Sequence, residues 1–208
     1  MPAPAKLLLA SSNLGKLREY QALTGTSSAT PVVELALLPG IASLPKFDES
    51  APTFAENAAG KALHYSCFAE LPVMADDSGL VVPALGGSPG VHSARYAGAG
   101  ASDADRFAKL LGELRARGVR DRAARFVCVI AIAQRGRVLA VVSDCVAGEL
   151  LEAPRGTQGF GYDPIFFYAL FGRSFAELSR EEKNQVSHRG KALRKMLDFF
   201  ASTQAGGV

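Results

Sequence analysis

The sequence places several groups that suit an anion at residues 11–16, Ser-Ser-Asn-Leu-Gly-Lys, directly after a short apolar run. If a strand gives way to a helix here, free N–H groups and the helix dipole favour an anion, and Lys16 adds a positive charge. Lys61 lies four residues after Asn57 on a predicted helix and can reach the same anion. The alternative is a helix capped by Asn13, with both lysines solvated. Residues around the segment lack the glycine and the hydroxyl residue of a Walker A loop.

A second group consists of the acidic residues Glu49, Glu56, Asp76 and Asp77. Asp76 and Asp77 follow the apolar run 73–75, and ligands of open α/β sheets bind beyond the carboxyl ends of strands. Two adjacent carboxylates repel each other, so a bound cation would relieve the cost, and such oxygen ligands suit Mg²⁺. The alternative is an ordinary Asp-Ser-Gly turn. Glu56 is better explained as one half of a helix capping box.

A third group carries aromatic rings and hydrogen-bond donors. Phe160 and Tyr162 lie in the glycine-rich segment 155–164, where a ring either packs beneath the loop or stacks on a planar ligand. Stacking of this kind contributes roughly 1–3 kcal/mol per base. His188 and Arg189 begin the last predicted helix and are donors that would recognise a carbonyl oxygen.

The elements around these groups predict an α/β fold with a mixed sheet, because strands and helices alternate early while the middle of the chain is a hairpin. The hairpin strands are apolar on both faces, which predicts a central place in the sheet. The segment Asp-Asp-Ser-Gly is expected to interrupt a strand. The predicted strands are residues 6–10, 32–38, 71–75, 80–82, 126–133, 138–146 and 165–167. The predicted helices are residues 13–25 and 53–69, one capped by Ser102, one near 180–182, and one that contains 192–200.

Composition restricts the class of protein. The chain has 208 residues, of which 48% are apolar and 21% are charged, so we expect one folded domain. A net charge of +3 suits an anionic small molecule and is too weak to indicate nucleic-acid binding. The three cysteines form no C-x-x-C pair, which favours buried free thiols in a reducing compartment. The absence of a signal peptide or membrane span predicts a cytoplasmic protein.

Six segments in this order resemble the conserved blocks of the inosine triphosphate pyrophosphatase family: SSNLGK, FDESAPTFAENAAGKA, ADDSGL, GGSPGVHSARYAG, GFGYDPIF and REEKNQVSHRGKAL. The resemblance runs from about Lys6 to Phe200. It implies Mg²⁺-dependent hydrolysis of ITP, dITP and XTP to the monophosphate and pyrophosphate. It also implies a homodimer and a strongly twisted mixed β-sheet flanked by helices. The chain would form a single domain over residues 1–208, with two lobes around a central substrate cleft and no separate linker.

The resemblance implies roles for individual residues. Glu49 and Asp77 would hold Mg²⁺, and Asp77 would also be the general base. The residues implied to bind phosphate are Ser11, Ser12, Asn13, Leu14, Gly15, Lys16, Lys61 and Ser78. The residues implied to bind the base are Phe160, Gly161, Tyr162, Asp163, Lys183, His188 and Arg189. The family's first block often begins with Thr, and Ser11 keeps that hydroxyl.

Other functions stay open at this point. One alternative is a Maf-type pyrophosphatase that acts on pyrimidine nucleotides, and a panel of triphosphates would separate the two. A nucleotide-binding protein without catalysis is another, which the carboxylates of Glu49 and Asp77 argue against. The missing Walker A loop disfavours a phosphotransferase. Gly60 lies inside a predicted helix, where glycine is unfavourable, and the sequence offers no reason for it.

Overall fold

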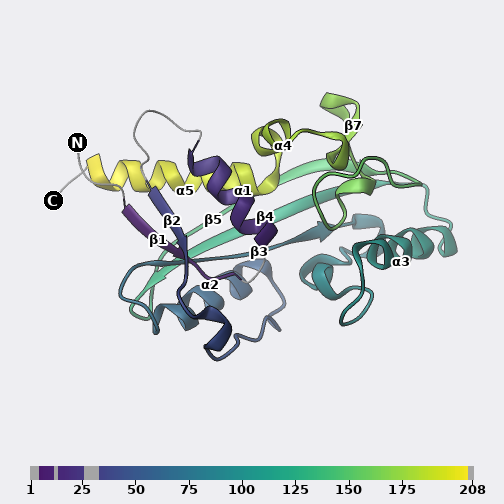
Figure 1. Ribbon diagram of the computed structural model, residues 1–208. Coiled ribbons are helices and arrows are strands. Elements are labelled where there is room, and N and C mark those ends of the chain that lie inside the picture. Colours follow the sequence, from purple (N-terminus) through teal and green to yellow (C-terminus); the bar gives the residue numbers. More distant parts are fainter. Residues whose placement is uncertain (1–4, 12–13, 26–32, 206–208) are drawn as a thin grey trace. The chain divides into compact units, whose positions relative to one another are not determined.

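The protein contains a mixed seven-stranded sheet flanked by helices, which confirms the predicted fold class (Figure 1). The computed structural model describes residues 5–11, 14–25 and 33–205. The strand order is β2-β1-β3-β4-β5-β6-β7. Strand β1 pairs in parallel with β2 and β3, whereas β6 pairs antiparallel with β5 and β7. The strands are β1 Ala5–Leu9, β2 Val33–Leu37, β3 Val73–Val81, β4 Ala123–Gln134, β5 Arg137–Leu150, β6 Phe166–Tyr168 and β7 Arg173–Ser174.

The helices begin at the capping residues that the sequence indicates. The Thr53 hydroxyl accepts a hydrogen bond from the Glu56 backbone at the start of α2, and Ser102 forms a capping box with Asp105 at the start of α3. Such caps satisfy N–H groups that a helix cannot satisfy itself. The predicted cap Asn13 lies outside the described residues. The helices are α1 Leu14–Gly25, α2 Phe54–Ser66, α3 Asp103–Ala116, α4 Arg180–Val186 and α5 His188–Ala205.

Two predictions about the strands and cysteines are wrong, and a third is confirmed. Strand β3 runs without a break through Asp-Asp-Ser-Gly, because Asp76 and Asp77 are buried among polar partners and do not form an exposed turn. The predicted central place of the hairpin strands is confirmed, because β4 and β5 both lie inside the strand order, although the start of β5 is largely exposed and Leu139 is 46% accessible. Of the three cysteines, all within the described part of the chain and none in a disulfide, only Cys128 is buried.

Contacts divide the chain into two compact units, and strands β3, β4 and β5 contribute residues to both. Unit 1 comprises Met1–Asp77, Cys128–Asp144 and Arg189–Val208, and unit 2 comprises Ser78–Val127 and Cys145–His188. Nowhere in the described ranges is there a helix of the length and apolar character needed to cross a membrane.

In unit 1, α1 and α5 cover one face of the strands and α2 lies on the other face (Figure 1). Tyr20 of α1 and Met196 of α5 pack with Met74 of β3 in one apolar cluster. The buried side chains of α2 include Ala58 and Ala62, which do not belong to that cluster. Successive residues of a strand alternate between the two faces, so the helix that meets a β3 side chain depends on its position in the strand.

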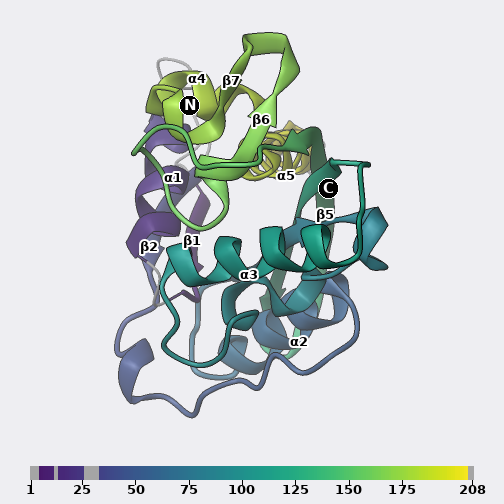
Figure 2. The same cartoon turned by 90° about the vertical axis from the view of Figure 1, so that its right-hand side faces the viewer.

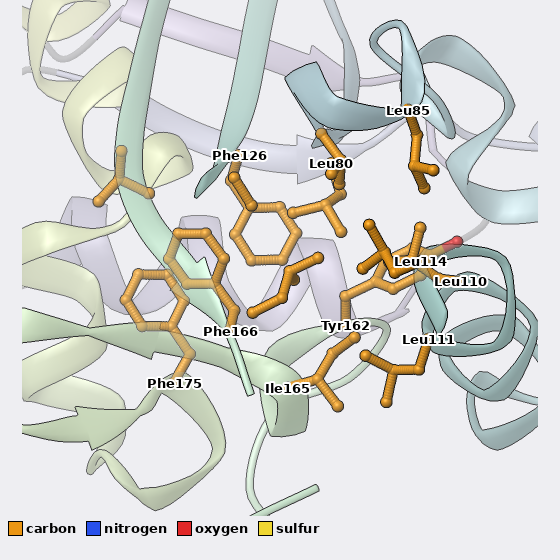
Figure 3. Packing of buried hydrophobic residues seen from close by; sticks show 14 of the residues in the cluster. Leu80, Leu85, Leu110, Leu111, Leu114, Phe126, Tyr162, Ile165, Phe166 and Phe175 are labelled. Atoms are coloured by element: carbon orange, nitrogen blue, oxygen red, sulfur yellow. The ribbon is translucent and has the colours of Figure 1, made fainter. Parts of the chain in front are cut away.

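In unit 2, a second apolar cluster joins α3 to the strands and to the segment between β5 and β6, which lies beside α3 (Figure 2). The rings of Phe126, Phe166 and Phe175 form its aromatic part, with the Phe126 and Phe166 centroids 4.6 Å apart (Figure 3). Leu110 and Leu114 of α3 contribute its aliphatic part. Tyr162, near the end of the glycine-rich segment 155–164, belongs to this cluster.

Candidate functional site

Strand β3 continues past the point at which β1 leaves the sheet. The Ala10 N–H, directly after β1, donates a hydrogen bond to the Met74 carbonyl of β3 at 2.8 Å. The chain then turns into α1, while β3 goes on to Asp76 and Asp77. Asp76 therefore lies close to the start of α1, where Lys16 contacts it, and Asp77 is the next residue of β3.

Asp76 and Asp77 point to opposite faces of β3. Asp76 Oδ2 lies 2.8 Å from Lys16 Nζ of α1 and 4.0 Å from Arg189 Nε of α5. Asp77 Oδ2 accepts a hydrogen bond of 3.0 Å from Asn57 Nδ2 of α2. This is the alternation that a strand imposes, and each carboxylate consequently has its own set of partners.

The Asp76 carboxylate is stabilised by cations. It is fully buried. Burial alone would raise its pKa, but the charges of Lys16, Lys61 and Arg189 outweigh burial and hold the pKa well below its usual range. Arg189 Nη1 also donates to Glu19 Oε2 at 2.9 Å. Asp76 thus stays ionised and keeps the Lys16 ammonium at the first turn of α1.

The surroundings of Asp77 do the opposite. Burial is the largest effect and raises the pKa of Asp77 to about 6, the hydrogen bond from Asn57 lowers it, and the nearby charge of Glu49 raises it. A divalent cation bound by the two carboxylates would offset the repulsion that Glu49 exerts on the ionised form of Asp77. The part of the chain that the structure describes contains no cluster of three or more Asp, Glu, His or Cys ligands. Mg²⁺ does not need one, since it binds through one or two carboxylates together with water and phosphate. Glu49 and Asp77 therefore fit it.

Glu49 belongs to an extended segment, residues 45–51, that runs along α2 and contacts it at every second residue. The Pro45 carbonyl lies 2.7 Å from His64 Nε2, and Glu49 Oε1 lies 2.5 Å from Lys61 Nζ. The Ala51 N–H donates to Asn57 Oδ1 at 3.0 Å. We call residues 45–51 the Glu49 strap.

The strap explains Gly60. A Cβ atom at this position would lie 2.6 Å from Cζ of Phe47, so the ring packs directly over the glycine. Glycine within a helix costs roughly 1 kcal/mol relative to alanine. Close packing of the strap offsets this cost, and it is a tertiary contact that the sequence alone does not reveal.

In unit 2, the predicted base-binding residues form a tied loop. Asp163 Oδ2 accepts hydrogen bonds from the Phe160 N–H at 2.9 Å and from Lys183 Nζ at 2.6 Å. The Lys183 ammonium also lies 5.2 Å from the centroid of the Phe160 ring, within cation–π range. The φ of Gly159 is +77°, and a Cβ there would overlap the Asp163 carboxylate. The loop therefore needs this glycine.

Two further contacts fix the loop. The Gly161 N–H donates to Asp103 Oδ2 at the start of α3, at 2.6 Å. The Tyr162 hydroxyl donates to the Ser93 carbonyl at 3.0 Å, and the Tyr162 ring is buried in the unit 2 core. Tyr162 is thus an anchor for the loop, while Phe160 lies beside Lys183.

The remaining predicted residues are distributed as follows. The His188 ring stacks on Phe126 in unit 2, with centroids 4.7 Å apart and planes 11° apart. The boundary between the units falls after His188, and Arg189 pairs with Glu19 in unit 1. Ser11 is buried and Ser78 is half-buried. Leu14 and Gly15 begin α1, whereas Ser12 and Asn13 lie outside the described residues.

Sequence reasoning missed four residues of these networks: Glu19, Asn57 as a partner of Asp77, Asp76 as a partner of Lys16, and Asp103. Asn57 was noticed only for sharing a helix face with Lys61. Successive side chains of a strand point to opposite faces, which would indicate that Asp76 and Asp77 have different partners. This signal applies only if β3 is continuous through both residues. No local pattern indicates Asp103 or Glu19, because their partners are 58 and 170 residues away.

The family model of the Ham1 family matches residues 7–199. The chain therefore belongs to the Ham1 family. A protein of Geobacillus kaustophilus (strain HTA426) named dITP/XTP pyrophosphatase is 50% identical over 191 residues, which cover 92% of each chain. A protein of the same name from Thermosynechococcus vestitus is 45% identical over 96% of this chain and 97% of the relative.

Solved structures agree with this assignment. A HAM1 protein from Coxiella burnetii superposes with a TM-score of 0.85 at 40% identity, over 96% of this chain and all of that chain. The Staphylococcus aureus Ham1 protein gives a TM-score of 0.82 at 36% identity, over 95% and 98% of the two chains. The fold described above is thus the fold of these proteins.

The packing of Phe47 on Gly60 predicts that Gly60→Ala displaces the Glu49 strap. We expect Mn²⁺, used as a paramagnetic substitute for Mg²⁺, to bind the variant more weakly in an electron paramagnetic resonance titration. The thermal midpoint should fall or stay constant, although helix propensity alone favours alanine by roughly 1 kcal/mol.

Gly112→Ala is the matched control, since a Cβ at Gly112 in α3 meets nothing within 4 Å. That variant should gain stability and keep its Mn²⁺ affinity. Equal behaviour of the two variants would contradict the role of the strap.

The bond from Gly161 to Asp103 predicts that Asp103→Ala loosens the Phe160 loop. A hydrogen bond to a charged group contributes about 1.5–3 kcal/mol, so amide exchange within residues 159–163 should rise roughly tenfold to a hundredfold. Hydrogen-exchange mass spectrometry measures this. Asp105→Ala removes a cap of the same helix without touching the loop, and should leave exchange there unchanged. If both variants or neither accelerate exchange, Asp103 does not hold the loop.

Proposed function

We propose that the chain hydrolyses the non-standard purine nucleoside triphosphates ITP, dITP and XTP to the monophosphate and pyrophosphate. The observation that carries the proposal is the group of charges beside the end of β1: Lys16 and Lys61 with the carboxylates of Asp77 and Glu49. Membership of the Ham1 family and two relatives named dITP/XTP pyrophosphatase support the substrate class. The activity is that of a hydrolase acting on the α–β phosphoanhydride.

In this proposal the positive charges bind the polyphosphate. The strand-to-helix turn, Ser11 to Lys16, supplies backbone N–H groups and the Lys16 ammonium, and Lys61 and Ser78 supply further donors. The ion pair with Asp76 holds Lys16 Nζ in place before the nucleotide arrives. Groups that are positioned in advance stabilise developing charge without the cost of reorganisation.

Glu49 and Asp77 would hold Mg²⁺, which when bound neutralises charge on the phosphates and activates the leaving pyrophosphate. Asp77 would orient a water molecule and accept its proton as the water attacks the α-phosphorus. The bond between the α-phosphorus and the bridging oxygen breaks, and pyrophosphate leaves. Asn57 restricts which oxygen of Asp77 is available, because Oδ2 already accepts its N–H.

The loop of unit 2 is assigned to the base. Phe160 would stack on the purine, and the ties from Asp163, Lys183 and Asp103 keep the loop in one conformation. His188 and Arg189 are the proposed donors to the 6-oxo group of hypoxanthine and xanthine. Adenine presents an amino group at that position, which would leave buried donors without acceptors and so disfavour ATP.

The two alternatives are less well supported. Both relatives described above are named for purine substrates and not for the pyrimidine substrates of the Maf type. A protein that only binds nucleotides would have no need of the costly buried Asp77. A homodimer and a cytoplasmic location are further proposals, for which the resemblance of the sequence is the support.

A panel of triphosphates tests the activity. With Mg²⁺, we expect pyrophosphate release from ITP, dITP and XTP, far slower release from ATP, GTP and dTTP, and no release after chelation of the metal. Pyrophosphate and phosphate are measured separately. Asp77→Asn, which keeps the size of the side chain, should abolish turnover in a protein that still unfolds cooperatively. Release of phosphate in place of pyrophosphate, or a preference for dTTP, would overturn the proposal.

Lys16 has two roles in this account, and a double variant separates them. Lys16→Ala should lower kcat/KM on the order of 10²–10³, as loss of one transition-state donor does elsewhere, and should also lower stability because Asp76 loses its partner. Adding Asp76→Asn should restore stability but not the rate. Lys6→Ala, at an exposed lysine of unit 1, is the control. Recovery of both properties in the double variant would reduce Lys16 to a counter-ion.

A further inference from the structure

The side chain of Asn57 contacts both carboxylate-bearing segments of unit 1. We propose that Asn57 is a positioning residue that brings the two predicted Mg²⁺ ligands, Asp77 and Glu49, to one place. This inference rests on the proposed function, and it concerns a residue that is neither a predicted ligand of Mg²⁺ nor a predicted contact of the nucleotide.

Both N–H groups and the carbonyl oxygen of the Asn57 side chain form hydrogen bonds. One Nδ2 hydrogen goes to Asp77 Oδ2 at 3.0 Å and the other goes to the Ala51 carbonyl at 3.3 Å. Oδ1 accepts the Ala51 N–H at 3.0 Å. The side chain is fully buried, and a buried amide is tolerated only when it is bonded in this way.

These partners also fix which way the amide points. The Ala51 N–H needs an acceptor, and the ionised Asp77 carboxylate needs a donor. A flipped amide would oppose both, so only one orientation of Asn57 fits. The Asn57 side chain therefore connects the backbone of the strap at Ala51 to Oδ2 of Asp77. It makes no hydrogen bond to Oδ1 of Asp77 in this orientation.

The two hydrogen bonds between Asn57 and the Ala51 backbone also restrict the position of Glu49. Both hydrogen-bonding groups of the Ala51 backbone are held by one rigid amide, two residues beyond Glu49 on the strap. The other end of the strap is held through His64 and through Phe47 on Gly60. Glu49 is thus confined between two fixed points on α2, and the same amide determines the position of Asp77.

Helix formation does not explain this residue. Asn57 makes an ordinary α-helical bond through its backbone, to the Thr53 carbonyl at 3.1 Å, and asparagine is a weak helix former in a helix interior. Its side chain points away from its own helix, to Ala51 and to Asp77 on β3.

The test measures metal binding without nucleotide, so that it does not depend on turnover. Mn²⁺ is titrated into the full-length protein and free Mn²⁺ is followed by electron paramagnetic resonance. Asn57→Ala should weaken Mn²⁺ binding roughly tenfold to a hundredfold, the range typical of residues that orient metal ligands. Thr53→Ala is the matched control, since it destabilises the start of the same helix without touching the amide. It should lower the thermal midpoint and leave the Mn²⁺ affinity unchanged.

The outcomes are distinct. If Asn57→Ala binds Mn²⁺ as the wild type does, or if Thr53→Ala weakens Mn²⁺ binding equally, the positioning role is wrong. If Asn57→Ala is unfolded at the assay temperature, Asn57→Ser is measured in its place, because serine cannot reach all three partners. Asn57→Ser should also weaken Mn²⁺ binding, and wild-type affinity in that variant would overturn the proposal. Asp77→Asn tests the proposed function separately: if it keeps wild-type Mn²⁺ affinity and turnover, that function fails whatever Asn57 does.

Discussion

The structure of unit 1 depends on two consecutive buried carboxylates in one strand. Because β3 is continuous, Asp76 faces α1 and α5 while Asp77 faces α2. The same carboxylic acid therefore occupies two environments with opposite effects on its pKa. Lys16, Lys61 and Arg189 outweigh the burial of Asp76, whereas burial dominates at Asp77 and the charge of Glu49 adds to it. One carboxylate holds cationic groups in position, and the other lies poised for a cation or a proton.

The helices serve as supports for these two faces. Helix α1 carries Lys16 to Asp76, and α5 carries Arg189, whose bond to Glu19 ties the two helices together. Helix α2 holds Asn57 and Lys61 toward β3 and packs the Glu49 strap through Gly60. Buried charge is expensive unless it is paired, so these networks would be costly in a protein that did not use them. In the proposed function, a polyanionic substrate and a metal would use these charges.

The sequence predicts most of the helices and strands, but it does not predict most of the contacts between distant side chains. Caps at Thr53 and Ser102 and apolar periodicity predicted the helices, since these signals are local. The prediction failed at Asp76-Asp77, where turn propensity was overridden by distant partners. The reason for Gly60 is the Phe47 ring that lies over it, and Asp103 carries no local sign of its bond to Gly161. Residues of this kind are determined by tertiary contacts, and a single sequence does not show which distant residues contact each other.

The central claim is that Asp76 and Asp77 act on different faces of β3 and have different functions. Comparison of Mn²⁺ binding to Asp76→Asn and Asp77→Asn, each confirmed as folded, tests it most directly. The account predicts that Asp77→Asn loses Mn²⁺ binding, while Asp76→Asn still binds Mn²⁺ and loses only the charge that holds Lys16. Equal loss of Mn²⁺ binding in both variants would show that the two carboxylates share one cation, and would contradict the account.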